Sequence, residues 1–179
     1  MNPPHPAPYD SVLDTIGWTP LIRLQRVGAG IRTPVYGKAE FFNPGGSVKD
    51  RIAFAMITKA MLEGQIDADT QIIEPSSGNT GVGLAMVCAA LGLRLTIVMP
   101  ETMTVERRML IKAYGAQLEL TPGPMGMKGS IARANELAKQ YPNSFIPMQF
   151  ENMANPEVHR RTTAQEILAD TQGNVDIFI

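Results

Sequence analysis

Apolar and polar residues follow two rhythms along the chain, and segments of the two kinds alternate. Short apolar runs bounded by turn residues predict strands at residues 21–24, 35–40, 71–74, 94–99, 116–120 and 145–148. Apolar residues at helical spacing predict helices at residues 48–63, 80–91, 104–114 and 127–140, and one after Asn155, with Asn155 as its cap. The pattern is typical of strand–helix–strand units.

Such units wind onto a parallel sheet, so the sequence predicts a three-layer α/β fold with a mostly parallel sheet and helices on both faces. A last apolar run, residues 175–179, has the pattern of a buried strand. Ligand loops in open α/β sheets begin where strands end. Because the chain stops on the final apolar residue of this run, we expect it to be truncated.

Composition excludes several classes of function. The chain has 179 residues, is 44% hydrophobic and 18% charged, and has a net charge of -1, which fits about one ordinary domain and favours neither a nucleic-acid nor a membrane partner. We find no signal-peptide pattern and expect a cytoplasmic protein. Cys88 lies in an apolar run and is expected to be buried, and with only His5 and His159 beside it we expect no metal site.

The most informative lysine lies where a glycine turn enters a helix. Ser47 and Asp50 have capping-box spacing, which predicts Lys49 as the second helical residue. The unpaired N–H groups of a first turn disfavour an ammonium group, and a neutral amine can attack an aldehyde cofactor and later act as a base. Gly45 and Gly46 would leave room for a flat ligand. The alternative is a solvated surface lysine.

A second polar turn, residues 75–83, joins a predicted strand to an apolar helix. Its N–H groups and hydroxyls at a helix N-terminus predict a site for a carboxylate or phosphate. Gly78, Gly81 and Gly83 match neither the dinucleotide nor the Walker spacing, which disfavours a nucleotide. The alternative is a tight turn in which Gly81 and Gly83 permit close helix packing. Gln149 follows another strand, at the edge where ligands gather.

Taken together, residues 43–51, 74–81, 99–108 and 149–159 resemble the cysteine synthase (O-acetylserine sulfhydrylase) family, which are pyridoxal-phosphate enzymes of fold type II. The resemblance implies that Lys49 holds pyridoxal 5'-phosphate as an internal Schiff base and that Asn79 bonds the cofactor's ring oxygen. It also implies a set of residues that bind the substrate carboxylate: Ser76, Ser77, Gly78, Asn79, Thr80 and Gln149.

The implied reaction makes L-cysteine from O-acetylserine and sulfide, in an enzyme that is a homodimer at full length. The implied organisation is an extension at 1–12, a segment at 13–34 that packs on the large domain, a small substrate-binding domain at 35–145 and the incomplete start of the large domain at 146–179. The family's phosphate-binding loop would follow residue 179, so the resemblance implies weak cofactor binding and impaired activity in the 179-residue chain alone. Two alternatives stay open, which are a cystathionine β-synthase using serine and homocysteine, and a non-catalytic fragment or interaction module.

Overall fold

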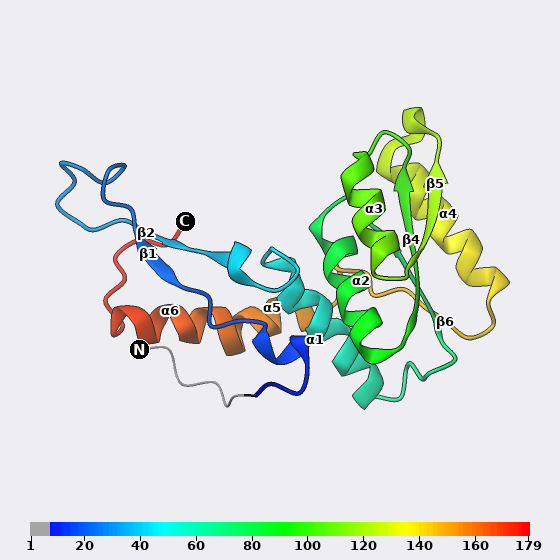
Figure 1. Cartoon of the computed structure of the whole chain (residues 1–179), viewed down its shortest axis with the longest axis horizontal. Helices are drawn as coiled ribbons and strands as arrows, with labels where there is room; N and C mark the ends of the chain where they lie inside the picture. Colours follow the sequence, from blue (N-terminus) through cyan, green and yellow to red (C-terminus); the bar gives the residue numbers. More distant parts are fainter. Residues whose placement is uncertain (1–7) are drawn as a thin grey trace.

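The computed structural model describes residues 8–179, so His5 and the rest of residues 1–7 lie outside the described residues. The chain forms two lobes that meet at helix α1 (Figure 1). One lobe is built on a four-stranded sheet in the order β5-β4-β3-β6, in which every pair of neighbours is parallel. Its strands are β3 (Gln71–Pro75), β4 (Arg94–Pro100), β5 (Gln117–Thr121) and β6 (Ser144–Phe145).

Helices cover both faces of this sheet, which confirms the predicted three-layer fold (Figure 1). On one face lie α1 (Lys49–Leu62), α2 (Asn79–Leu91) and α3 (Val105–Ala113), and on the other lies α4 (Gly126–Gln140). Successive side chains of a strand point to opposite faces. Ile72 therefore joins the core under α1 and α2, while Ile73 packs with Ala134 and Leu137 of α4.

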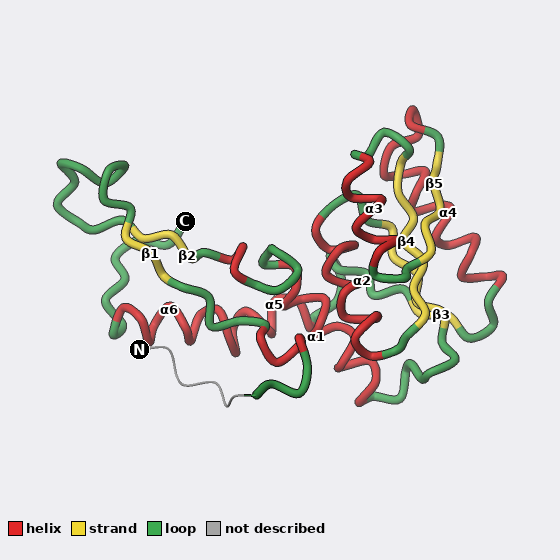
Figure 2. Tube along the Cα trace, viewed as in Figure 1, coloured by secondary structure: helices red, strands yellow, loops and turns green. Residues whose placement is uncertain are grey.

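The other lobe contains an antiparallel pair of strands and a long helical segment. The strands are β1 (Leu21–Arg23) and β2 (Tyr36–Lys38), flanked by the short helices η1 (Val12–Thr15) and η2 (Glu40–Phe42). Figure 2 shows one nearly continuous helical run made of α5 (Ala154–Val158), the π-helical turn η4 (His159–Thr163) and α6 (Ala164–Thr171). The remaining short helix, η3 (Gly123–Met125), precedes α4.

A buried ion cluster fastens α1 to this second lobe. The Arg51 guanidinium is 1% exposed and pairs with Glu40 at 2.8 Å and with Glu166 of α6 at 2.5 Å. Lys38 of β2 contacts the same Glu166 carboxylate at 2.8 Å. Since the helix that begins at Lys49 is held from both lobes, the start of α1 has a fixed position between them.

Three sequence predictions fail at the edges of the fold. The strand predicted at 145–148 ends at Phe145, because the chain turns at Met148, where φ is +54°. The strand predicted at 175–179 is irregular backbone with exposed apolar side chains, since no described strand lies beside it to pair with its backbone. The helix predicted after Asn155 starts at Ala154, whose N–H is accepted by the Asn152 side chain at 2.9 Å.

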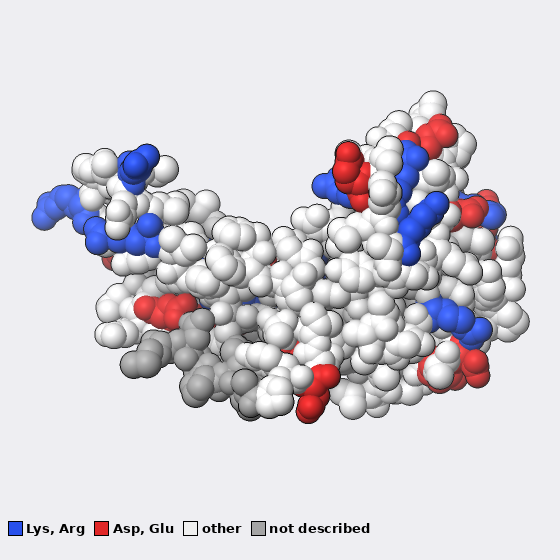
Figure 3. Space-filling model, in the orientation of Figure 1, with Lys and Arg blue, Asp and Glu red and all other residues white. Residues whose placement is uncertain are grey.

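Charge is spread over both lobes. On the face seen in Figure 3, Lys and Arg side chains gather at the two ends of the molecule, and the middle, where the outline is hollowed, carries few charges. Within residues 8–179 there is no helix that combines the length and the apolar character needed to cross a membrane. The cytoplasmic location and the domain boundaries stay predictions.

Candidate functional site

Lys49 is the first residue of α1, one position nearer the helix start than the capping-box spacing predicts. Val48 precedes it with φ −57° and ψ −19°, already helical values. The Ser47 hydroxyl oxygen accepts the N–H of Lys49 at 3.1 Å, rather than that of Asp50 as in the predicted box. The helix start is therefore stabilised by a side-chain oxygen, and Lys49 lies in its first turn.

The glycine turn before α1 makes room for a protein side chain. Asp50 turns back and accepts the Gly45 N–H at 2.6 Å, and a Cβ on Gly45 would lie 2.5 Å from Asp50 Oδ1. The expectation that Gly45 leaves space for a ligand is thus wrong, since the Asp50 carboxylate fills that space. Burial raises the pKa of Asp50 to about 6. Gly46 has φ +82° and an added Cβ there would meet nothing within 4 Å.

Glycines in α2 bring the two functional stretches together. A Cβ on Gly83 would lie 3.1 Å from the Lys49 carbonyl oxygen and 3.2 Å from Ala53 Cβ. A Cβ on Gly81 would lie 3.3 Å from the Ser76 hydroxyl oxygen. The helix-packing role considered for both glycines is confirmed for Gly83, whereas Gly81 packs against the turn residue Ser76. The Gly83 contact places the start of α1 against the start of α2.

The polar turn after β3 is held by its own side chains. Ser76 is 3% exposed, and its Oγ accepts the Gly81 N–H at 3.0 Å. Thr80 is 4% exposed and donates to Gln149 Oε1 at 2.6 Å. Because α2 runs for 13 residues from Asn79, this turn lies at the positive end of a helix dipole. The arrangement suits a bound anion.

All the site residues predicted from the sequence line one cavity of about 400 Å³. Lys49 contributes to it from α1, the turn from Ser76 to Thr80 lies beside it, and Gln149 closes it from the segment after β6. The remaining lining residues are Glu74, Pro75, Met127, Ile131, Asn135, Ile146, Met148, Phe150 and Glu151. The cavity therefore combines an amine, a polar turn and a largely apolar wall.

Lys49 differs from the two nearby lysines in its lack of a counter-ion. Lys38 pairs with Glu166 at 2.8 Å, and Lys59 pairs with Glu63 at 3.7 Å. Among residues 8–179, no carboxylate lies within ion-pair distance of Lys49 Nζ. An amine that lines a cavity without a counter-ion is available to a ligand.

Sequence reasoning missed two parts of this site. Glu74 lines the cavity with 2% exposure. Burial raises its pKa to about 7, although the N–H groups that donate hydrogen bonds to it lower the pKa. A charged residue within a buried strand pattern was the available signal. Met127, Ile131 and Asn135 form the α4 wall, four residues apart along one helix face, but their spacing could not show which ligand site they face.

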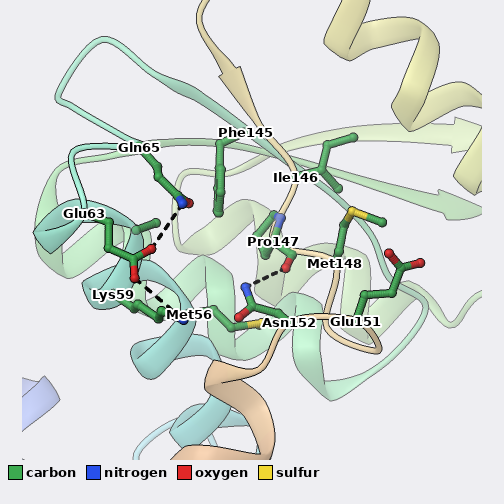
Figure 4. Close-up of a pocket in the computed structure, with 11 residues that line it drawn as sticks. Met56, Lys59, Glu63, Gln65, Phe145, Ile146, Pro147, Met148, Glu151 and Asn152 are labelled. Carbon is green, nitrogen blue, oxygen red and sulfur yellow. Dashed lines mark hydrogen bonds and ion pairs between the residues drawn. The ribbon is translucent and has the colours of Figure 1, made fainter.

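A second cavity of about 250 Å³ borders the same segment after β6 (Figure 4). It contains none of the predicted site residues, although Ile146, Met148 and Glu151 line both cavities. Three of its polar side chains are already paired with one another, since Glu63 contacts Lys59 and accepts from Gln65 at 3.1 Å. The second cavity therefore has fewer unpaired polar groups for a ligand than the first.

Comparison with known proteins assigns the chain to a family. The profile described as "Pyridoxal-phosphate dependent enzyme" matches residues 12–179. The chain belongs to the pyridoxal-phosphate dependent enzyme family. A cysteine synthase of Staphylococcus aureus is 53% identical over 173 residues, which cover 96% of this chain and 56% of the relative. The chain thus spans about half the length of the curated family members that it matches.

Solved structures agree with this assignment. A cysteine synthase from Entamoeba histolytica superposes with a TM-score of 0.92 at 42% identity, over 98% of this chain and 53% of that one. An O-acetylserine-dependent cystathionine β-synthase from Helicobacter pylori superposes with a TM-score of 0.85 at 38% identity, over 90% of this chain and 54% of that one. The similarity covers both lobes of the fold.

The cavity has groups that fit part of the family's cofactor. Lys49 brings an amine, the reactive partner of an aldehyde, and Asn79 brings an amide that can bond a ring oxygen. An added Cβ at Gly78, which lines the cavity, would meet nothing within 4 Å, so the backbone there is open to a flat ring. These residues fit the aldehyde and ring end of pyridoxal phosphate.

Proposed function

We propose that the cavity is the part of a pyridoxal-phosphate site in which Lys49 holds the cofactor and the turn after β3 holds an amino-acid substrate. The proposed reaction is a β-replacement that converts O-acetyl-L-serine and sulfide into L-cysteine and acetate. The full-length protein would act on these small molecules as a homodimer, as the family resemblance implies.

One observation carries the proposal. Lys49 begins α1 and the turn from Ser76 to Thr80 leads into α2, and both line the same cavity. An amine without a counter-ion among residues 8–179 suits an aldehyde, and the start of a helix suits a carboxylate. A surface lysine beside a merely structural turn would not bring these two complementary groups to one cavity.

Each part of the cavity then has a task. The start of α2, together with the Ser77 hydroxyl and the Gln149 amide, binds and orients the substrate carboxylate. Lys49, released when the substrate amine takes its place on the cofactor, would use its amine to remove the proton from the substrate Cα and later return it there. Pyridoxal phosphate, when bound, would supply the electron sink that makes this proton acidic. Met127 and Ile131 of α4 give the cavity an apolar wall beside the reacting carbon.

The net bond changes lie on the substrate Cβ, because the proton taken from Cα returns to it. Its bond to the acetate oxygen breaks, a bond to sulfur forms, and sulfide takes the place of acetate without any net oxidation. A cystathionine β-synthase reaction would use the same residues but bring homocysteine as the thiol. The likeness to the Helicobacter pylori enzyme keeps this as the second candidate. The two differ in the thiol accepted, so a competition assay with sulfide and homocysteine separates them.

The test uses the 179-residue chain and excess pyridoxal phosphate. At saturating pyridoxal phosphate we expect a visible absorption band in the wild-type chain that is lost in Lys49→Ala, followed by L-cysteine formation at an impaired rate when O-acetylserine and sulfide are added. Lys38→Ala is the matched control and should keep the band. Equal absorption in wild type and Lys49→Ala, with no product, would favour the non-catalytic alternative.

A further inference from the structure

Glu74 is a buried carboxylate for which the reaction described above has no task. It is the fourth residue of β3, is 2% exposed and lies opposite Ile97 of β4. Burying a carboxylate is costly unless its oxygens are hydrogen-bonded. The hydrogen-bond partners of Glu74 therefore indicate what it does.

One partner is a strained turn next to the cavity. β6 pairs with β3 only at Gln71 and Ile72, so the second half of β3 has no strand on that side. There the Glu74 side chain accepts the backbone N–H of Met148 at 3.3 Å. Met148 has φ +54°, a left-handed conformation that is strained for a non-glycine residue. Glu74 thus stabilises the turn that aims the next residue, Gln149.

The other partner is the Gln149 side chain itself. Its Nε2 makes a long hydrogen bond of 3.5 Å to Glu74, and its Oε1 accepts from Thr80 at 2.6 Å. A threonine hydroxyl can donate or accept, whereas an ionised carboxylate only accepts. Of the two neighbours, Glu74 is therefore the one that fixes the amide orientation, with Nε2 toward Glu74 and Oε1 toward Thr80.

We propose that Glu74 is a positioning residue that turns the Gln149 amide so that its N–H, rather than its carbonyl oxygen, is available to a carboxylate in the cavity. One Nε2 hydrogen points to Glu74 and the second remains for a ligand. The identity of that ligand, an α-amino acid, rests on the proposed function. The orientation of the amide does not.

Few charged groups lie near Glu74. Of the residues that line the same cavity, Lys49 of α1 and Glu151 of the segment after β6 can carry charge, and the α4 residues are uncharged. Burial raises the pKa of Glu74 to about 7, while the N–H groups of Met148 and Gln149 and the Gln149 side chain lower it. A protonated Glu74 would have a hydrogen to donate, which suits the Gln149 carbonyl oxygen and reverses the amide.

The first test needs no ligand. The Gln149 side-chain NH₂ resonances, identified by their loss in Gln149→Ala, should shift with a midpoint near the Glu74 pKa of about 7. We expect the shift to vanish in Glu74→Gln and to persist in Glu74→Asp, which keeps an acceptor-only carboxylate. Glu157→Gln, at an exposed carboxylate on α5, is the control and should keep the shift. A titration that is unchanged in folded Glu74→Gln overturns the proposal.

The second test is a double-mutant cycle with O-acetylserine as the probe, in chains loaded with pyridoxal phosphate. Glu74→Gln should weaken O-acetylserine binding at least about tenfold while the cofactor absorption band is retained. In the Gln149→Ala background the same change should have less than about a twofold effect. Equal losses in both backgrounds would show that Glu74 does not act through Gln149. Failure of wild type to bind the cofactor would count against the proposed function, and the NH₂ titration would still decide the role of Glu74.

Discussion

The Thr80 hydroxyl donates to Gln149 Oε1 at 2.6 Å, which joins the start of α2 to the segment after β6 across 69 residues of sequence. This bond closes the cavity on the side where the polar turn lies. It also completes a chain of hydrogen bonds from Glu74 through Gln149 to Thr80.

Removing this bond tests the anion site. Thr80→Val keeps the shape but loses the donor, so we expect amino-acid binding to weaken by about 1–3 kcal/mol while pyridoxal phosphate is retained. Ser77→Ala should act in the same direction. Equilibrium titration with O-acetylserine measures the effect, and Thr171→Val, in α6, serves as control. Loss of the cofactor with unchanged amino-acid affinity would mean that the turn binds the cofactor phosphate instead.

The ion cluster predicts a large difference between two arginines. Arg51→Ala leaves Glu166 buried at 2% exposure without its main partner, which should cost about 3–5 kcal/mol of unfolding free energy. Arg160→Ala breaks only an exposed pair with Glu157 and should cost less than about 1 kcal/mol. Urea unfolding of both variants checks this. Similar losses would show that the buried cluster does not stabilise the fold.

Stability should depend on pH through Glu74. Its pKa rises from 4.5 to about 7 on folding, so between these values the folded state retains a proton that the unfolded state releases. The contribution of Glu74 is therefore fully present below about pH 4.5 and is lost as pH rises through about 7, at about 1.4 kcal/mol per pH unit. The measurement is the difference in unfolding free energy between wild type and Glu74→Gln.

The comparison of two proteins removes the contributions of other groups. Those include Asp50, whose pKa is also raised, and His159, whose pKa is lowered by burial and by nearby Arg51 and Lys49. We expect wild type to lose stability relative to Glu74→Gln as pH rises from 4.5 to 7.5. A difference that stays constant, or that moves in favour of wild type, would show that the Glu74 carboxyl is ionised in the folded state throughout this range.

Close packing of α1 on α2 can be tested by adding one methyl group. In Gly83→Ala the new Cβ would lie 3.1 Å from the Lys49 carbonyl oxygen and must push the helices apart, at a cost of about 1–3 kcal/mol. Gly37→Ala on β2 meets only an ordinary contact at 3.7 Å and should be nearly neutral. If thermal unfolding shows equal stability for the two variants, α1 does not depend on this glycine for its position.

Much of the sheet lobe could be predicted from the sequence, because the burial of its strands under helices on both faces produces their continuous apolar pattern. Ile72 and Ile73 are both fully buried, since each faces a helix layer on its own side of the sheet. The same reasoning fails for residues 175–179, where an apolar pattern lies in irregular, exposed backbone. An apolar run indicates that burial is favourable, but a strand also requires a neighbour, and a local pattern does not show whether one exists.

The parts of the candidate site that depend on local helix-start chemistry could be predicted from the sequence, whereas specific side-chain contacts could not. Lys49 and the turn after β3 follow from local helix-start chemistry. The space beside Gly45 is filled by Asp50, and the role of Glu74 depends on a left-handed Met148 that is 74 residues away in sequence. The Gly45–Asp50 contact is local, but the capping-box spacing predicts a different partner for Asp50. The Glu74–Met148 contact arises from tertiary packing and leaves no sequence signal of its own.

The central claim is that Lys49 is the residue that bonds the cofactor aldehyde. The direct measurement treats the 179-residue chain with pyridoxal phosphate, reduces it with borohydride and locates the pyridoxyl group by peptide mapping. We expect the label on Lys49, with little on Lys38 and Lys59, whose amines are paired with Glu166 and Glu63. A label that favours Lys38 or Lys59, or that is spread equally over the three, would contradict the assignment of this cavity.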